Sequence, residues 1–125
     1  MYTLAVRRSF IARHALVGGD WGRENEPNAH RYLLELRLSG DALDRHGFLV
    51  DIVDVEHELD GLVQRYRDAM LNDQPEFNGL NPSLENFARI LTVAIASGLQ
   101  GKGLASVEVV LWEDESAWAS YEVKV

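Results

Sequence analysis

The sequence contains no cysteine among its 125 residues. This absence excludes disulfide bonds, a thiolate nucleophile and any zinc site built on sulfur ligands. The chain also has no apolar stretch close to the length that a membrane-spanning helix needs. Its first residues lack the apolar core and the cleavage site of a signal peptide. We therefore expect a cytoplasmic protein that does not associate with a membrane.

Positive charge is also scarce, since 12 Lys and Arg stand against 20 Asp and Glu and the net charge is −8. Binding to a phosphate backbone requires clustered Lys and Arg, so no nucleic-acid partner is expected. The length predicts a single domain over residues 1–125. With 46% hydrophobic residues, such a chain buries a core without covalent cross-links.

Alternating hydrophobicity predicts two long strands in the first third of the chain. The first covers residues 2–14, where apolar side chains share one parity and only Arg8 interrupts them. The second covers residues 30–39, where Leu33 alone breaks the alternation of a half-buried antiparallel strand. Between them, residues 15–27 are rich in glycine and charge. A loop of that length is more typical of a functional segment than of a simple connection.

The hydrophobic period then changes from that of a strand to that of a helix. Apolar residues recur at helical spacing over residues 51–70 and again over residues 83–97. Ser83 is a typical N-cap for the second helix, and Gly98 is expected to form its C-terminal cap.

Two further strands, 105–113 and 118–124, close the chain around a short acidic turn. The expected order is therefore β-β-α-α-β-β. This order is typical of an α+β fold in which two helices pack on one face of a four-stranded antiparallel sheet.

Antiparallel pairing of the first two strands makes a spatial prediction about two histidines. His14 ends the first strand and His30 begins the second, so the two imidazoles converge at one end of the sheet. Asn28 shares their parity if the second strand extends backward. Imidazole is a preferred zinc ligand, so these residues are either metal ligands or ordinary hydrogen-bonded residues at strand ends.

Several short segments carry a more specific pattern. Phe10–His14 matches F-x-A-x-H, and Asn28–Tyr32 is similar to H-G-H-x-Y except that the first histidine and the glycine are replaced. Gly47–Asp51 is similar to G-M-V-x-D. Leu71–Asp73 reads L-N-D, and Asn81–Asn86 is similar to N-P-T-x-E-N. In this order, and over nearly the whole chain, they resemble the 6-pyruvoyl-tetrahydropterin synthase and 6-carboxy-tetrahydropterin synthase family.

The resemblance implies a tunnelling fold, in which homotrimers join their sheets into a barrel and two trimers often stack into a hexamer. It implies active sites between subunits, where zinc held by three histidines polarises the side chain of a dihydropterin triphosphate. A cysteine assisted by an Asp–His pair acts as the base in that family. Glu113 stands where the family has the glutamate that anchors the pterin ring through a bidentate contact, and we favour this role over that of an ordinary strand-end carboxylate.

Three departures from the family pattern concern the catalytic groups. Asn28 stands at the first histidine of H-G-H, so the implied metal ligands are His14, Asn28 and His30. Glu24 stands at the cysteine position, where it is either a general base or a solvated loop carboxylate. Asp68 stands within the Asp–His position and is the second candidate catalytic residue.

The loop register leaves Glu26 as an alternative metal ligand to Asn28. Three functions then compete. The first is a zinc-dependent lyase that acts on a dihydropterin such as dihydroneopterin triphosphate. The second is a non-catalytic protein that binds a pterin or purine. The third is an aldolase-like variant that cleaves the pterin side chain with Glu24 as its base, because some relatives with glutamate at the cysteine position do so.

Overall fold

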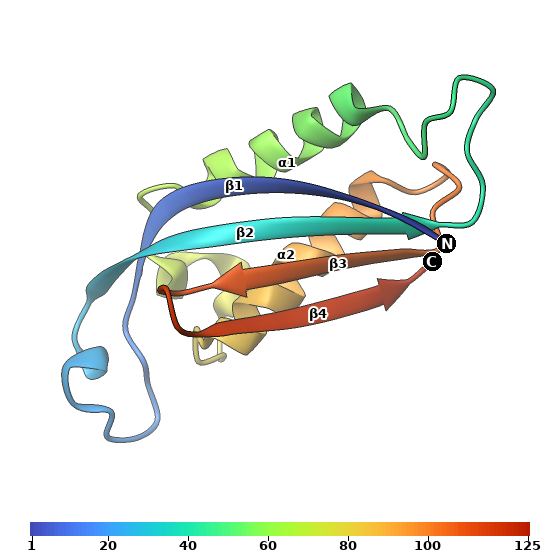
Figure 1. Ribbon diagram of the computed structural model, residues 1–125. Helices are drawn as coiled ribbons and strands as arrows, with labels where there is room; N and C mark the ends of the chain where they lie inside the picture. Colours follow the sequence, from blue (N-terminus) through green and yellow to red (C-terminus); the bar gives the residue numbers. More distant parts are fainter.

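The computed structural model describes all residues, 1–125, and contains one sheet and two main helices. The strands are β1 (Tyr2–His14), β2 (Asn28–Gly40), β3 (Ser106–Trp112) and β4 (Trp118–Lys124), and the helices are α1 (Ile52–Tyr66) and α2 (Leu84–Gly98). The strands lie in the order β1-β2-β3-β4 and every neighbouring pair is antiparallel. Figure 1 shows α2 running behind the sheet and α1 running beside β1. The predicted β-β-α-α-β-β fold is confirmed.

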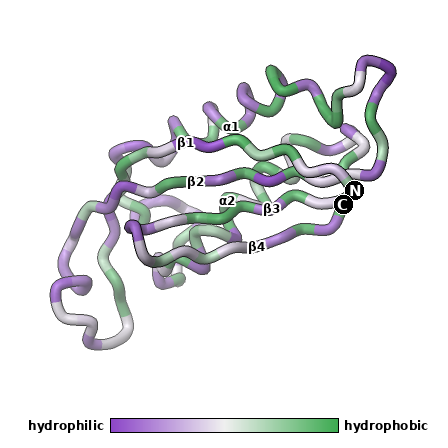
Figure 2. The backbone as a smooth tube through the Cα atoms, viewed as in Figure 1, coloured by the Kyte–Doolittle hydropathy of each residue, from purple (hydrophilic) through white to green (hydrophobic).

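The helix-covered face of the sheet holds the hydrophobic core. Even-numbered residues of β2 and odd-numbered residues of β3 point toward the helices, and most of them are fully buried. Their alternation with polar residues is visible as changing colour along the strands (Figure 2). Phe87 of α2 lies at the centre of an aromatic cluster, and its ring contacts those of Phe10, Tyr32, Tyr66 and Phe77.

Arg8, which interrupts the apolar parity of β1, has a partner on α1. Its guanidinium donates to Glu56 at 2.7 Å and to Asp60 at 2.6 Å. The side chain remains about a quarter exposed, at 27%. A charged residue is therefore tolerated on this face, because Arg8 lies at the margin of the core, where its guanidinium reaches two carboxylates of α1.

The first helix is shorter than the predicted range 51–70. It ends at Tyr66, and Asp68 adopts a φ of 60°, in the left-handed region, which is incompatible with a right-handed α-helix. The chain then runs beside β1, where the Asp68 amide donates to the Ile11 carbonyl at 2.6 Å and Arg13 forms a bridge with Met70. Hydrogen bonds to the strand edge therefore replace those that would have continued the helix.

The N-cap of the second helix is confirmed, since the Ser83 hydroxyl accepts from the Asn86 amide at 3.1 Å. Gly98, expected as the C-terminal cap, is instead the last helical residue, and Leu99 follows as the cap. A Cβ on Gly98 would lie 2.5 Å from a carboxylate oxygen of Glu58. The glycine therefore serves a close approach between α2 and α1 rather than a change of backbone direction.

The opposite face of the sheet carries a compact charge cluster. The Glu35 carboxylate accepts from Arg7 at 2.7 Å and from Arg37 at 2.5 Å, and only 9% of its side chain is exposed. The hydrogen bond from Arg7 lowers the pKa of Glu35, and the hydrogen bond from Arg37 lowers it further. Burial acts to raise the pKa, but the two hydrogen bonds outweigh it, so the pKa lies below the ordinary 4.5.

Because the folded state lowers the pKa of Glu35, this carboxylate stabilises the fold above its unfolded-state pKa. The contribution disappears as the pH falls through the lower, folded-state value. We predict that Glu35→Gln lowers the free energy of unfolding by about 1–2 kcal/mol at pH 7 and flattens its decline below about pH 4.5. Urea titrations between about pH 7 and pH 3 measure both effects. Glu122→Gln on the exposed strand β4 is the control, and equal pH slopes for wild type and Glu35→Gln would contradict the prediction.

Candidate active site

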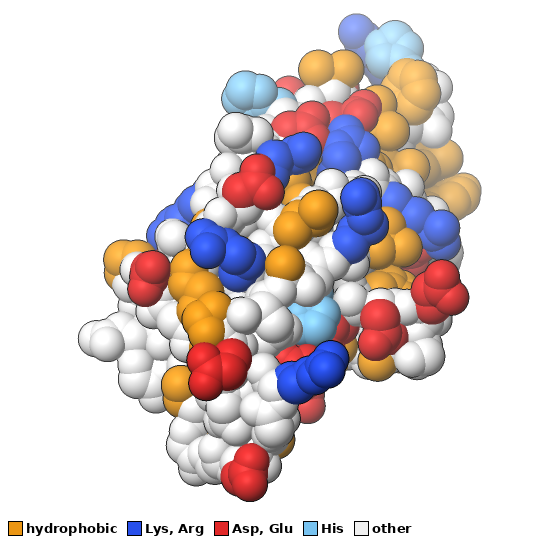
Figure 3. All heavy atoms as spheres, turned by 90° about the vertical axis from the view of Figure 1, so that its left-hand side faces the viewer, with side chains coloured by type: hydrophobic (Ala, Val, Ile, Leu, Met, Phe, Trp, Pro, Cys, Tyr) orange, Lys and Arg blue, Asp and Glu red, His pale blue; other side chains and the backbone are white.

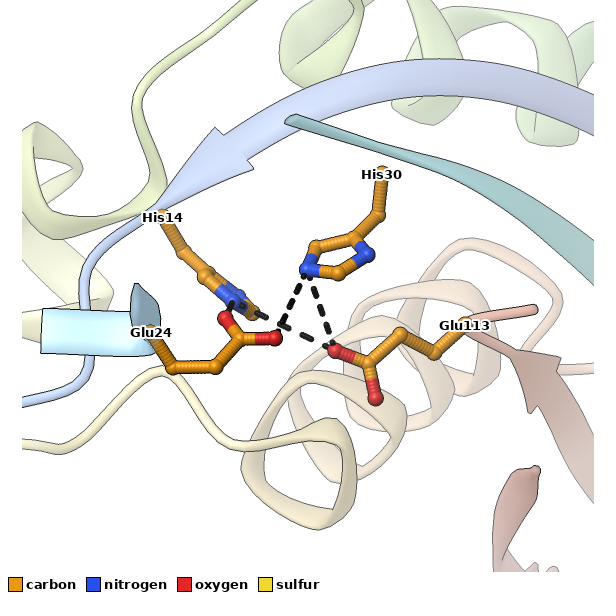
Figure 4. Close-up of side chains that lie close together, drawn as sticks. All are labelled: His14, Glu24, His30 and Glu113. Atoms are coloured by element: carbon orange, nitrogen blue, oxygen red, sulfur yellow. Dashed lines mark hydrogen bonds and ion pairs between the residues drawn. The ribbon is translucent and has the colours of Figure 1, made fainter. Parts of the chain in front are cut away.

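Four titratable side chains converge at the end of the sheet where β1 and β3 finish and β2 begins. They are His14, Glu24, His30 and Glu113, and one ligand atom from each lies within 4.8 Å of the others. Figure 4 shows the two imidazoles and the two carboxylates pointing toward a common centre. Imidazole nitrogen and carboxylate oxygen are both zinc ligands, so this arrangement is able to hold a divalent cation.

Strand register brings the histidines together. His14 pairs with Asn28 and Ala12 pairs with His30 in the β1–β2 ladder. His14 and His30 are therefore diagonal neighbours on the helix-covered face, and their ring centroids lie 4.8 Å apart. The convergence predicted from parity and pairing is what the structure contains.

Both ring nitrogens of His14 are engaged, and its side chain is only 2% exposed. Nε2 lies 3.0 Å from Glu24 Oε2, and Nδ1 lies 3.2 Å from the hydroxyl of Tyr32. An ionised carboxylate only accepts, so Nε2–H donates to Glu24, whereas the phenol of Tyr32 is able either to donate to Nδ1 or to accept from it. If Nε2 binds a metal, Nδ1–H donates to the same hydroxyl, because a phenol both donates and accepts.

His30 has a buried Nε2 without any hydrogen-bond partner. The nearest carboxylate oxygens are 3.4 Å away on Glu24 and 3.3 Å away on Glu113, but neither forms a hydrogen bond with it. Buried polar atoms without partners are rare in folded proteins because they lose their hydration without replacement. A bound cation between these groups would satisfy this nitrogen, so the residues present fit a metal.

The loop between β1 and β2 places Glu24 by backbone contacts. Its carbonyl accepts from the Leu16 amide at 2.7 Å, and a 3-10 turn covers Gly22–Asn25. The neighbouring Asn25 side chain accepts from the Trp21 amide at 2.7 Å and donates to the carbonyls of Leu16 and Gly19. The loop is thus folded onto itself, which directs Glu24 toward the histidines.

The electrostatics of Glu24 favour its ionised form. Partial burial acts to raise its pKa, but the hydrogen bond from His14 and the charge of His30 outweigh this, so the pKa lies below its usual value. The ionised carboxylate is the form that binds a cation.

Glu113 follows β3 and is placed by the turn into β4. Its amide donates to the Ala117 carbonyl at 3.1 Å. In the same turn the Asp114 carboxylate accepts from the Ser116 amide at 2.8 Å and from the Ala117 amide at 3.0 Å. The backbone hydrogen bond from Ser116 is the main cause of a lowered pKa for Asp114. Glu113 is therefore held on a rigid turn with 24% of its side chain exposed.

Two hollows meet at the cluster. One, of about 480 Å³, includes Trp21, Trp118 and Glu113. The other, of about 750 Å³ on the opposite side, includes Trp112, Arg31 and again Glu113. Figure 3 views this end of the molecule, where acidic and basic side chains surround a histidine at the surface. Both volumes are typical of small-molecule sites.

The structure brings together four of the six site residues predicted from the sequence. Asn28 lies beside the cluster, and its Nδ2 donates to the carbonyls of His14 at 3.2 Å and Glu26 at 2.9 Å. Its role as a metal ligand stays a prediction. Asp68 is exposed in the turn after α1 and is not among the converging groups, so no catalytic role follows from its position. Glu26 is exposed and also lies outside the cluster.

Three positioning residues were not recognised in the sequence. Tyr32 contacts His14, Asn25 holds the loop, and the Asn72 amide pairs with both backbone groups of Ala15 at 2.9 Å. Asn72 belongs to the L-N-D segment, so the sequence identified the motif but did not predict the hydrogen bonds of Asn72 to Ala15. Contacts between residues 57 positions apart depend on the folded chain.

Comparison with solved structures first defines the class of protein. The chain is similar to Caenorhabditis elegans 6-pyruvoyl tetrahydropterin synthase, with a TM-score of 0.86 at 20% identity over 98% of this chain and 96% of that one. A Plasmodium vivax 6-pyruvoyltetrahydropterin synthase with a catalytic glutamate changed to alanine gives 0.80 at 16% identity, over 99% and 98%. A putative dihydroneopterin aldolase from Vibrio cholerae gives 0.58 at 12% identity, over 100% and 98%. The chain therefore has the tunnelling fold.

The family follows from the sequence itself. Residues 3–124 match the model of the 6-pyruvoyl tetrahydropterin synthase family. The chain belongs to this family, and the low identities to the solved structures make it a divergent member. No curated protein matches the sequence.

We predict that Asn25→Ala loosens the loop that carries Glu24. The change removes a side chain that makes three hydrogen bonds to the loop backbone, each worth about 1 kcal/mol. Amide hydrogen exchange at Leu16 should become at least about tenfold faster. Asn78→Ala is the control, because Asn78 is exposed in another loop. Unchanged exchange at Leu16 would show that other contacts hold the loop.

Proposed function

We propose that this protein is a metal-dependent lyase that acts on the side chain of a dihydropterin such as dihydroneopterin triphosphate. The observation that carries the proposal is the convergence of His14, His30, Glu24 and Glu113 at one point in a member of this family. Each group has a chemical task in such a reaction. Family membership favours the pterin class of substrate, and the donor types favour zinc as the metal.

His14 and His30 are the proposed metal ligands. When bound, zinc supplies a Lewis acid that stabilises negative charge developing on an oxygen of the substrate side chain. The buried, unpartnered Nε2 of His30 supports this assignment. Tyr32 supports it as well, because its hydroxyl holds Nδ1 of His14 and so orients the ring.

Glu113 is the proposed anchor for the pterin ring. A pterin presents an N–H and an exocyclic amine side by side, and one carboxylate accepts both hydrogen bonds. The adjoining hollow contains the indoles of Trp21 and Trp118, which offer flat apolar surfaces to a planar ring. A ring bound in this way would lie near the cluster, with its side chain toward the histidines.

Glu24 is the proposed group that moves the proton. It stands where the family has its cysteine, and its carboxylate oxygens lie 3.0 Å from Nε2 of His14 and 3.4 Å from Nε2 of His30, at the centre of the cluster. The glutamate described as catalytic in the Plasmodium vivax relative supports the use of a carboxylate for this task. The likeness to a putative dihydroneopterin aldolase favours side-chain cleavage with Glu24 as the base as the second candidate reaction.

Turnover of dihydroneopterin triphosphate by the zinc-loaded protein tests the proposal. Release of triphosphate indicates synthase-type elimination, and release of an aldehyde fragment indicates side-chain cleavage. We expect Glu24→Gln to lower kcat by about 10²–10⁴-fold. We expect Glu113→Gln to raise KM, whereas Glu122→Gln leaves both constants unchanged.

Other outcomes of this assay are equally informative. Pterin binding without turnover, abolished by Glu113→Gln, would establish the non-catalytic binding protein instead. Neither turnover nor binding of any dihydropterin would overturn the proposed substrate class.

We also propose that the protein forms a homotrimer, or a hexamer of two stacked trimers. β1 and β4 are the unpaired edges of the sheet, and large apolar side chains near the start of β1 remain exposed, such as Phe48 at 61% and Ile52 at 44%. Joining such edges between subunits removes free backbone groups from water and covers apolar surface. Sedimentation equilibrium should give three or six times the monomer mass, and a monomer at micromolar concentration would contradict the proposal.

A further inference from the structure

The proposed metal centre has only two imidazoles within reach. A protein zinc site normally has at least three protein ligands. His14 and His30 are the only histidines in the cluster, so the third ligand must be an amide or a carboxylate. The candidates at this end of the sheet are Asn28, Glu24 and Glu113.

The hydrogen bonds of Asn28 are made by its amide nitrogen with the backbone. Its Nδ2 donates to two backbone carbonyls, those of His14 and Glu26, at 3.2 and 2.9 Å. Those bonds join the end of β1 to the start of β2 and orient the amide along the loop backbone. Asn28 therefore has a structural task that explains its presence without a metal.

Glu24 has the opposite character, because its two oxygens face the two histidines. Oε2 lies 3.0 Å from Nε2 of His14, and Oε1 lies 3.4 Å from Nε2 of His30. Zinc binds nitrogen and oxygen at 2.0–2.2 Å, so neighbouring ligand atoms of a tetrahedral site lie about 3.3 Å apart. The two separations, one from each oxygen of Glu24, are within about 0.3 Å of that spacing, so the carboxylate as a whole lies between the two histidines.

Glu113 is less evenly placed between the histidines. Its Oε1 lies 3.3 Å from Nε2 of His30 but 4.0 Å from Nε2 of His14. It also opens into both hollows at the site. This position suits a group that meets the substrate.

We infer that Glu24 completes the metal ligand set in the substrate-free protein, and that Asn28 is a residue that holds the loop rather than a ligand. The inference rests on the metal site of the proposed function and names its third ligand. A carboxylate also offsets one positive charge of the ion in a partly buried site, which a neutral amide does not. The same carboxylate is then the proton acceptor once substrate occupies the site, so one residue serves the resting and the reacting enzyme.

Zinc binding without substrate tests the inference directly. Titration calorimetry should show one zinc per chain for the wild type and at least about a 100-fold weaker affinity for Glu24→Gln. Loss of a direct ligand should exceed the 10–100-fold effect of outer contacts. Glu26→Gln removes the same charge two residues away on an exposed side chain, and it should stay within about threefold of wild type. Asn28→Ala removes only an outer contact to His14 and should weaken zinc binding less than Glu24→Gln does.

A spectroscopic measurement covers the case in which Glu24→Gln does not fold. Cobalt substituted for zinc reports its ligands through its visible absorption. Asn28→Ala should leave the cobalt spectrum of the wild-type protein unchanged, and a changed spectrum would overturn the inference. Circular dichroism of each variant shows whether the fold is kept.

The remaining outcomes separate this inference from the proposed function. Normal zinc affinity in Glu24→Gln together with lost turnover would overturn the ligand role and leave the proposed enzyme standing. Weak binding in Asn28→Ala or Glu113→Gln, with full affinity in Glu24→Gln, would assign the third position to that residue instead. A wild-type protein that binds no zinc would overturn both the ligand role and the proposed metal dependence.

Discussion

The antiparallel register between β1 and β2 is the constraint on which the site depends. Pairing of Ala12 with His30 and of His14 with Asn28 puts both imidazoles on the helix-covered face at one end of the sheet. A slip of one residue would turn the apolar residues of β1 toward the open face and expose them to water. The burial of the core therefore enforces the geometry of the site, because the same alternation governs Phe10 and His14.

The aromatic core reaches the site through Tyr32. Its ring stacks on Phe10 and meets the edge of Phe87, while its hydroxyl contacts Nδ1 of His14. Burial and the nearby negative charges of Glu113 and Glu24 raise the pKa of Tyr32, so the phenol stays protonated. Tyr32 thus connects the buried aromatic cluster to the imidazole of His14, and its hydroxyl fixes the orientation of that ring.

The carboxylates arrive from less regular segments. Glu24 comes from a loop folded around Asn25, and Glu113 comes from the turn between β3 and β4, which Asp114 holds by accepting backbone amides. The strands therefore position the two histidines, whereas a loop and a turn position the two carboxylates.

The sequence by itself determined the element order, the parity of the strands and the convergence of His14 with His30, because periodicity and antiparallel pairing are local rules. Its motifs also indicated the family that residues 3–124 match. Only the tertiary structure decided that α1 ends at Tyr66, that Gly98 approaches Glu58 and that Asp68 lies outside the cluster. It also decided that both oxygens of Glu24 face the histidines while Asn28 holds the backbone. These outcomes depend on contacts between distant segments and on how a loop folds, and neither hydrophobic period nor motif spacing encodes them.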